Sequence, residues 1–190
     1  MEKLLVLDNY DSFIYNLVYY LRESSDNLEI NVFRNDKIGL EEIDKYDRIL
    51  LSPGPGLPHE AGILKQLIGR YGKDKKILGV CLGHQAIAEV YGGSLKQLDR
   101  VFHGISTAAE IIDFDEQLFR GIPANLSVGR YHSWLVDKET LPACLGITAV
   151  DDRGEIMAIR HKEFKISGVQ FHPESVLTEY GMKMIANWLI

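Results

Sequence analysis

A cysteine stands between two glycines at the point where an apolar run gives way to a helical pattern. The stretch Gly79-Val-Cys81-Leu-Gly83 has the spacing of a nucleophile elbow, a strand-to-helix turn too tight for bulky flanking residues. Such a turn lifts the thiol out of the sheet, and the positive end of the following helix favours the reactive thiolate. The backbone N–H of Leu82 would face the negative charge that develops on a substrate oxygen. We therefore expect Cys81 to be a nucleophile.

Two other interpretations fit the same stretch. Cys81 could be a buried cysteine at a helix start, or it could form a zinc site together with His84. The zinc hypothesis is weaker because structural zinc sites need four ligands and the second cysteine of the chain, Cys144, stands alone. We expect no metal, no cofactor and two free thiols.

A base for this thiol is predicted near the end of the chain. The segment Gly168-Val-Gln-Phe-His172-Pro-Glu174 follows an apolar run, so His172 should emerge at the end of a strand. Pro173 favours an extended backbone before it, in which side chains two residues apart project to the same side. A carboxylate beside an imidazole fixes its tautomer. We expect His172 to be the base and Glu174 to orient it, with His84 capping or packing in the elbow helix.

The elements that must position these groups alternate along the chain. Core strands are expected at residues 3–7, 29–34, 48–51, 76–80 and 165–170. Helices are expected from Asp11 or Ser12 onward and at 40–46, 61–71, 83–91 and 177–189. Shorter alternating strands are expected at 106–111, 126–129, 147–150 and 156–160. The pattern predicts an α/β fold with a doubly wound, mostly parallel, flavodoxin-like sheet flanked by helices and a small antiparallel excursion, in a single domain of residues 1–190.

A loop rich in proline and glycine, Ser52-Pro-Gly-Pro-Gly-Leu-Pro58, follows the third expected strand. In doubly wound sheets ligands bind beyond the carboxyl ends of the strands. Both this loop and Cys81 lie at such ends, so we expect them to form one site.

Composition narrows the class of protein. The chain has 190 residues and a formal net charge of -6, and its 21 Lys and Arg residues form no basic stripe, so we expect no nucleic-acid partner. No apolar run reaches membrane-spanning length, and no signal-peptide pattern is present at the N-terminus. We expect a cytoplasmic protein that does not bind membranes.

Three of these stretches resemble the ordered signatures of class I (triad) glutamine amidotransferases. They are Ser52-Pro-Gly-Pro-Gly56, Gly79-Val-Cys-Leu-Gly-His-Gln85 and Gln170-Phe-His-Pro-Glu174. Two more, Asp8-Asn-Tyr-Asp-Ser-Phe13 and Arg130-Tyr-His-Ser133, resemble the small subunit (component II) of anthranilate synthase and its relative in para-aminobenzoate (aminodeoxychorismate) synthesis.

The resemblance implies roles for particular residues. Cys81 would attack the side-chain amide of glutamine, His172 would move the protons and Glu174 would orient His172. The oxyanion hole would be the backbone N–H groups of Gly54 and Leu82, and the glycine would let the backbone approach the substrate. The implied glutamine-binding residues are Gly54, Pro55, Gly56, Gln85, Ser133 and Trp134. Many relatives have leucine where Trp134 stands, a change that a backbone contact should tolerate.

The resemblance also implies a partner, because free ammonia is useful only if it is captured. That partner would be a chorismate-using synthase subunit (component I), docked around the mouth of the site. Residues 8–13 would belong to the docking surface, or would only cap the first helix. Between the anthranilate and para-aminobenzoate pathways the sequence does not decide, although we favour anthranilate; a subunit shared by both pathways is a third option.

Two further functions compete with this one. A cysteine hydrolase acting on γ-glutamyl peptides could share the fold and the Cys-His pair. A flavodoxin-like binding module could cradle a phosphate at residues 8–12, but the two aspartates there, Asp8 and Asp11, would repel it.

Overall fold

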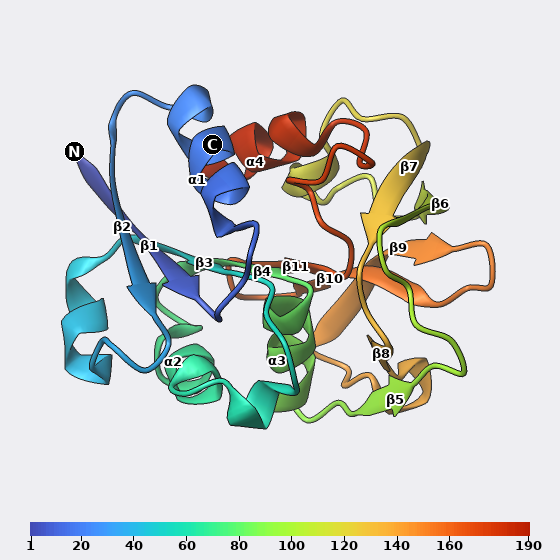
Figure 1. Ribbon diagram of the computed structural model, residues 1–190, viewed down its shortest axis with the longest axis horizontal. Coiled ribbons are helices and arrows are strands. Elements are labelled where there is room, and N and C mark those ends of the chain that lie inside the picture. The colour runs from blue at the N-terminus through green and yellow to red at the C-terminus, as the bar shows by residue number, and fades with distance from the viewer.

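A nine-stranded sheet runs through the computed structural model, which describes residues 1–190 (Figure 1). Its strand order is β2-β1-β3-β4-β11-β10-β9-β6-β7. The first five strands are parallel: β2 (Leu28–Arg34), β1 (Glu2–Asp8), β3 (Arg48–Leu51), β4 (Lys76–Val80) and β11 (Ile166–Val169). The last four are antiparallel: β10 (Ile156–His161), β9 (Leu145–Asp151), β6 (Ile105–Ile111) and β7 (Asn125–Arg130). A separate two-stranded sheet pairs β5 (Leu95–Gln97) with β8 (Trp134–Val136).

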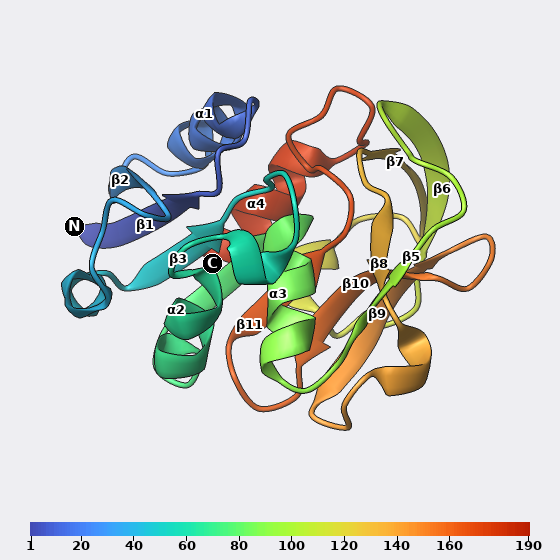
Figure 2. The ribbon, with the colours of Figure 1, turned by 60° about the horizontal axis from the view of Figure 1, so that its bottom comes forward.

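Helices cover both faces of the parallel half. Helices α1 (Ile14–Ser24) and α4 (Gly181–Leu189) lie on one face, and α2 (Leu64–Tyr71) and α3 (Leu82–Val90) lie on the other (Figures 1 and 2). Strand β1 shows why two faces are buried: Leu4 and Val6 pack with α1 and α4, and Leu5 and Leu7 pack with α2 and α3. Burial of alternate side chains on opposite faces is the expected result of the strand's period of two.

The predicted doubly wound, mostly parallel architecture is confirmed, but its antiparallel part is larger than expected. β10 pairs with β11 in antiparallel register, so four antiparallel strands continue the main sheet. Only β5 and β8 form a small separate sheet, and neither of these three-residue strands was predicted. Strands this short carry too few alternating positions to be recognised from sequence.

Three helices begin later than the sequence pattern predicted. α1 starts at Ile14 rather than Asp11 or Ser12, and its N-cap position is Phe13, which makes no side-chain capping bond. α2 starts three residues late, at Leu64. α4 starts at Gly181 rather than residue 177 because the preceding residues form a turn in which Thr178 N–H donates to the Ser175 carbonyl at 3.0 Å. The expected helix at residues 40–46 is a 3-10 helix, Leu40–Lys45.

No helix of the structure is both long enough and apolar enough to cross a membrane.

Candidate active site

The predicted elbow is present at the junction of β4 and α3. Cys81 has φ 50° and ψ -99°, a conformation that a residue with a side chain rarely adopts. A Cβ atom on Gly79 would lie 2.5 Å from the carbonyl carbon of Gly83, and one on Gly83 would lie 2.6 Å from the Leu51 carbonyl oxygen. Both glycines are therefore required by close backbone packing, which holds the thiol at the carboxyl edge of the sheet.

Leu82 is the first residue of α3. Backbone N–H groups in the first turn of a helix have no partner within that helix, so they are available to an anionic ligand. The N–H of Leu82 therefore has the position in the chain that an oxyanion-hole donor requires.

His172 and Glu174 are in contact, as the sequence predicted. Nδ1 of His172 lies 2.7 Å from Oε1 of Glu174, and the two side chains are 6% and 1% exposed. The expected reason for this contact was wrong, because the backbone there is not extended. Ser175 N–H donates to the His172 carbonyl at 3.2 Å, which closes a turn with Pro173 at its second position, where proline is favoured.

The surroundings of His172 favour its protonated form. Burial lowers the pKa of His172, but its interactions with the neighbouring Cys81 and Glu174 outweigh burial and raise the pKa to about 10. At neutral pH the ring is thus an imidazolium beside the thiol. The ring of Tyr131 lies 4.8 Å from the His172 ring, centroid to centroid, and shields one side of it.

Two neighbouring cavities meet at Cys81. The larger, of about 430 Å³, contains Cys81 and His172 together with Asp11, Gly54 and Tyr131. The smaller, of about 170 Å³, is lined by Cys81 and by all six residues predicted to bind substrate: Gly54, Pro55, Gly56, Gln85, Ser133 and Trp134. The structure therefore brings together groups that are far apart in the sequence: Gly54 and Trp134, which line the same cavity, are 80 residues apart.

Gly54 has no room for a side chain on the protein side either. A Cβ atom on Gly54 would lie 2.3 Å from the Asn9 carbonyl oxygen, so the glycine is required by packing against the loop after β1. Asn9 also holds Ser52 twice: its backbone N–H donates to the Ser52 hydroxyl, and its side-chain amide donates to the Ser52 carbonyl, both at 2.8 Å. Asn9 thus holds the start of the proline-glycine loop against the loop that follows β1.

Gln85 and Trp134 are joined directly. The Gln85 side-chain amide donates to the Trp134 carbonyl at 3.0 Å and to Oε1 of Gln170 at 3.1 Å. Gln170 in turn donates to the sulfur of Cys81 at 3.5 Å. The neighbouring carbonyl of Ser133 accepts from the Leu98 N–H at 2.8 Å. The small β5-β8 sheet therefore holds the backbone that lines the smaller cavity.

Sequence reasoning did not identify several residues of the site, among them His132, which lines the smaller cavity. Tyr131 lines both cavities and Gln170 contacts the thiol, although both lie inside sequence motifs that were used only for the resemblance. Asp11 lines the larger cavity; burial and the negative charge of Glu174 raise its pKa to about 6. Its position near Glu174 depends on how the chain folds, which no local sequence pattern indicates.

His84 packs inside the elbow helix, as predicted. It is fully buried, and a Cβ atom on Gly168 would lie 3.0 Å from its Nδ1. Burial lowers the pKa of His84 to about 4, so the ring is neutral near pH 7. Cys81 and Cys144 are both free thiols, as predicted.

Comparison with known proteins gives consistent results. The family described as glutamine amidotransferase class-I matches residues 5–190. The aminodeoxychorismate/anthranilate synthase component 2 of Bacillus subtilis is 46% identical over 98% of this chain and 95% of its own length. The bifunctional protein TrpGD of Thermotoga maritima is also 46% identical, over 100% of this chain, which spans only 32% of that protein.

A solved structure shares the whole fold. A protein from Thermoplasma acidophilum, described as a putative component of GMP synthase, superposes with a TM-score of 0.87 at 28% identity, over 100% of this chain and 92% of that one.

Proposed function

The chain belongs to the class-I glutamine amidotransferase family, and from that premise we propose that it releases ammonia from glutamine for a chorismate-using synthase. The observation that carries the proposal is the smaller cavity. One pocket of about 170 Å³ places the Cys81 thiol beside all six residues expected to bind glutamine. His172, which is paired with the buried Glu174, lines the adjoining larger cavity.

The reaction proceeds through a thioester. The Cys81 sulfur attacks the side-chain amide carbon of glutamine, and the carbonyl oxygen becomes an oxyanion held by the N–H groups of Gly54 and Leu82. The C–N bond then breaks, and the His172 imidazolium gives its proton to the departing nitrogen, which leaves as ammonia. Water attacks the thioester, neutral His172 takes the proton of that water, and glutamate leaves as the thiol is restored.

Glu174 supports both halves of this cycle. Its carboxylate accepts a hydrogen bond from Nδ1 of His172 at 2.7 Å, which points Nε2 of the ring away from Glu174. Nε2 is buried and has no other hydrogen-bond partner in the protein. It is therefore free to exchange a proton with the thiol, the leaving nitrogen or the attacking water.

The competing functions have less support. A phosphate-binding module would use the loop after β1, where the raised pKa of Asp11 reflects burial and the negative charge of Glu174, a setting that disfavours a second anion. A γ-glutamyl peptide hydrolase could share the Cys81–His172 pair, but the relative that is 46% identical over 98% of this chain is an aminodeoxychorismate/anthranilate synthase component 2, which favours glutamine as the substrate.

The partner would dock around the mouth of the larger cavity. Tyr10 and Phe13 line that cavity and are 47% and 52% exposed, and Val176 on the adjoining rim is 96% exposed. Exposed aromatic side chains beside a polar site are typical of a protein interface. The alternative is that residues 8–13 only cap α1. It has less support because the N-cap residue of α1 makes no side-chain capping hydrogen bond.

Transfer of labelled nitrogen tests the proposal. The chain is mixed with chorismate, glutamine labelled with ¹⁵N in its side-chain amide, and either an anthranilate-forming or an aminodeoxychorismate-forming synthase subunit. We expect ¹⁵N in the aromatic product of at least one mixture, and the productive subunit identifies the pathway, for which we favour anthranilate.

The control is Cys81→Ala, which should abolish glutamine-dependent labelling but leave the synthase able to use added ammonia. Labelling that survives in Cys81→Ala would exclude the proposed mechanism. Hydrolysis of γ-glutamyl peptides faster than glutamine would favour the cysteine hydrolase instead.

A further inference from the structure

A buried ion pair lies behind the smaller cavity, away from the thiol. Nη1 of Arg130, on β7, is 2.8 Å from Oδ2 of Asp151, at the end of β9, and the two side chains are 2% and 3% exposed. Desolvation of two charges costs about as much as their attraction returns, so a buried ion pair adds little stability over apolar side chains of the same size. A pair buried this deeply points to a use other than stability.

The second contact of Arg130 fixes a histidine. Nε of Arg130 donates to Nε2 of His132 at 3.0 Å. Since Nε2 accepts this hydrogen bond, the ring proton is on Nδ1, which lies 3.0 Å from the Trp134 carbonyl oxygen and donates to it. Burial and the positive charge of Arg130 lower the pKa of His132 to about 3, so the ring stays neutral and keeps this tautomer.

The Trp134 carbonyl is connected to the Cys81 sulfur through further hydrogen bonds. It also accepts from the Gln85 amide at 3.0 Å, and Gln85 is joined through Gln170 to the sulfur of Cys81. His132, Gln85 and Trp134 all line the smaller cavity. An unbroken series of hydrogen bonds therefore connects the buried ion pair to the wall of the proposed glutamine site.

We propose that Arg130 and Asp151 are positioning residues for substrate: they hold His132 in one tautomer and thereby fix the Ser133–Trp134 backbone and Gln85 around glutamine. This inference rests on the proposed function, since it takes the smaller cavity to be the glutamine site. Neither residue touches the thiol, so their removal should weaken substrate recognition and leave the reactivity of the sulfur intact.

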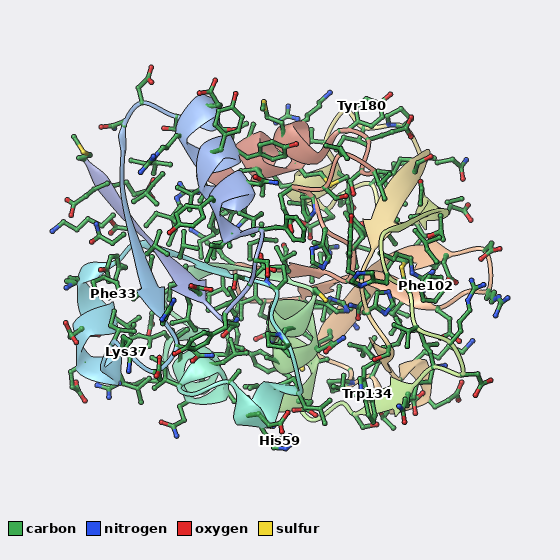
Figure 3. All side chains as sticks on the ribbon, in the orientation of Figure 1. Phe33, Lys37, His59, Phe102, Trp134 and Tyr180 are labelled. Carbon is green, nitrogen blue, oxygen red and sulfur yellow. The ribbon has the colours of Figure 1, made fainter.

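A neighbouring arginine provides a matched control. Arg130 and Arg100 both place a guanidinium over the ring of Phe102, at 3.8 and 4.3 Å from its centroid. Phe102 stacks on His132 with 5.4 Å between ring centroids, and Phe102 and Trp134 both lie toward the antiparallel end of the sheet (Figure 3). Arg100 is exposed and donates no hydrogen bond to His132. Arg100→Met therefore removes a similar cation–π contact and leaves the tautomer of His132 unchanged.

Two alkylating reagents separate recognition from reactivity. A diazo-ketone analogue of glutamine must occupy the glutamine pocket before it reacts with Cys81, whereas iodoacetamide needs only an accessible thiol. In Arg130→Met we expect the rate of diazo-ketone labelling to fall about tenfold, the effect of leaving buried partners unpaired. Iodoacetamide labelling should stay within about twofold, and Arg100→Met should label like the unchanged protein with both reagents.

Other outcomes overturn the inference. Diazo-ketone labelling of Arg130→Met at the unchanged rate would mean that the ion pair positions nothing. An equal fall with both reagents would mean that the substitution disturbs the thiol itself. If the unchanged protein fails to react with the diazo-ketone, the proposed function fails and the inference with it.

A measurement on the unchanged protein covers the case in which Arg130→Met does not fold. Long-range ¹H–¹⁵N spectra of histidine-labelled protein report which ring nitrogen carries the proton. We expect His132 to be the Nδ1–H tautomer and not to titrate between pH 5 and 8. An Nε2–H tautomer, or titration in that range, would contradict the inference whether or not glutamine is the substrate.

Discussion

The parallel half of the sheet ends in side chains that would react, whereas the antiparallel half contributes buried charges that act through other protein groups. Cys81 directly follows β4, and His172 lies three residues after the end of β11, so both are beyond the carboxyl ends of parallel strands. β7 and β9 contribute Arg130 and Asp151, both buried. Reactive groups must reach substrate, so they lie on turns that line a cavity; supporting groups act through hydrogen bonds and can lie deeper in the fold.

If the parallel half supplies the reacting groups, substitutions there should lower kcat more than they change KM. The largest effect is expected at Glu174. Glu174→Gln should lower kcat about 100-fold, the range of general acid–base contributions, with KM within about twofold because Glu174 does not line the smaller cavity. The substitution also removes a charge that raises the pKa of His172. The imidazolium then loses its proton at lower pH, so the alkaline fall in activity should move below its position near pH 10.

Rates measured from pH 6 to 11 with the synthase subunit present would check this prediction. Glu179→Gln, at an exposed carboxylate outside both cavities, serves as the control and should leave the profile unchanged. An unshifted pH–activity profile in Glu174→Gln, or a rise in KM as large as the fall in kcat, would contradict the assignment of reactive groups to the parallel half of the sheet.

Glycine-to-alanine substitutions in the two halves should differ in their effect on the free energy of unfolding. A Cβ on Gly83 would lie 2.6 Å from the Leu51 carbonyl oxygen, whereas on Gly146, in β9, the nearest atom is 3.8 Å away on the flexible Lys162 side chain. We expect Gly83→Ala to lower the free energy of unfolding by about 2–3 kcal/mol through overpacking. Gly146→Ala should leave it unchanged or raise it by about 0.5 kcal/mol. Urea unfolding measures both, and equal losses would mean that the elbow is no tighter than an ordinary strand.

Two buried histidines give the smallest expected effect. His132 has hydrogen bonds on both ring nitrogens, whereas neither nitrogen of His84 has a partner. Burial holds the pKa of His84 near 4, below the value of about 6.5 for an unfolded chain. As the pH falls below about 6.5, the unfolded state binds a proton that the folded state excludes, so stability is lost.

His84→Leu removes this contribution. Between pH 7 and 5.5 the variant should lose about 1 kcal/mol less unfolding free energy than the unchanged protein. His59→Leu, at an exposed surface position (Figure 3), should not alter the pH dependence. If His84→Leu retains the full loss on acidification, another group is responsible for it.

The sequence predicted the parallel half more completely than the antiparallel half, for a physical reason. Gly79, Cys81 and Gly83 act within one turn, and His172 and Glu174 within another, so their spacing alone reveals them. The Arg130–Asp151 pair and the Gln85–Trp134 contact join residues 21 and 49 positions apart. Their partners are set by strand pairing that local periodicity does not specify.

Even the successful predictions succeeded partly for other reasons. Gly54 is expected to let the backbone approach substrate, and its lack of a side chain also makes room for Asn9. His172 and Glu174 were expected on an extended segment, but a turn brings them together. A glycine or proline in the sequence indicates a constrained backbone. Which neighbouring residue makes that constraint necessary is known only from the folded structure.

The role of Cys81 as the nucleophile is tested most directly by the mass of the intact protein after reaction with the diazo-ketone analogue of glutamine, followed by peptide mapping. We expect one adduct, on Cys81, that is blocked by glutamine, absent in Cys81→Ser and formed more slowly in His172→Ala. An unmodified protein in the presence of a candidate synthase, or an adduct on Cys144, would contradict the assignment of Cys81 as the nucleophile.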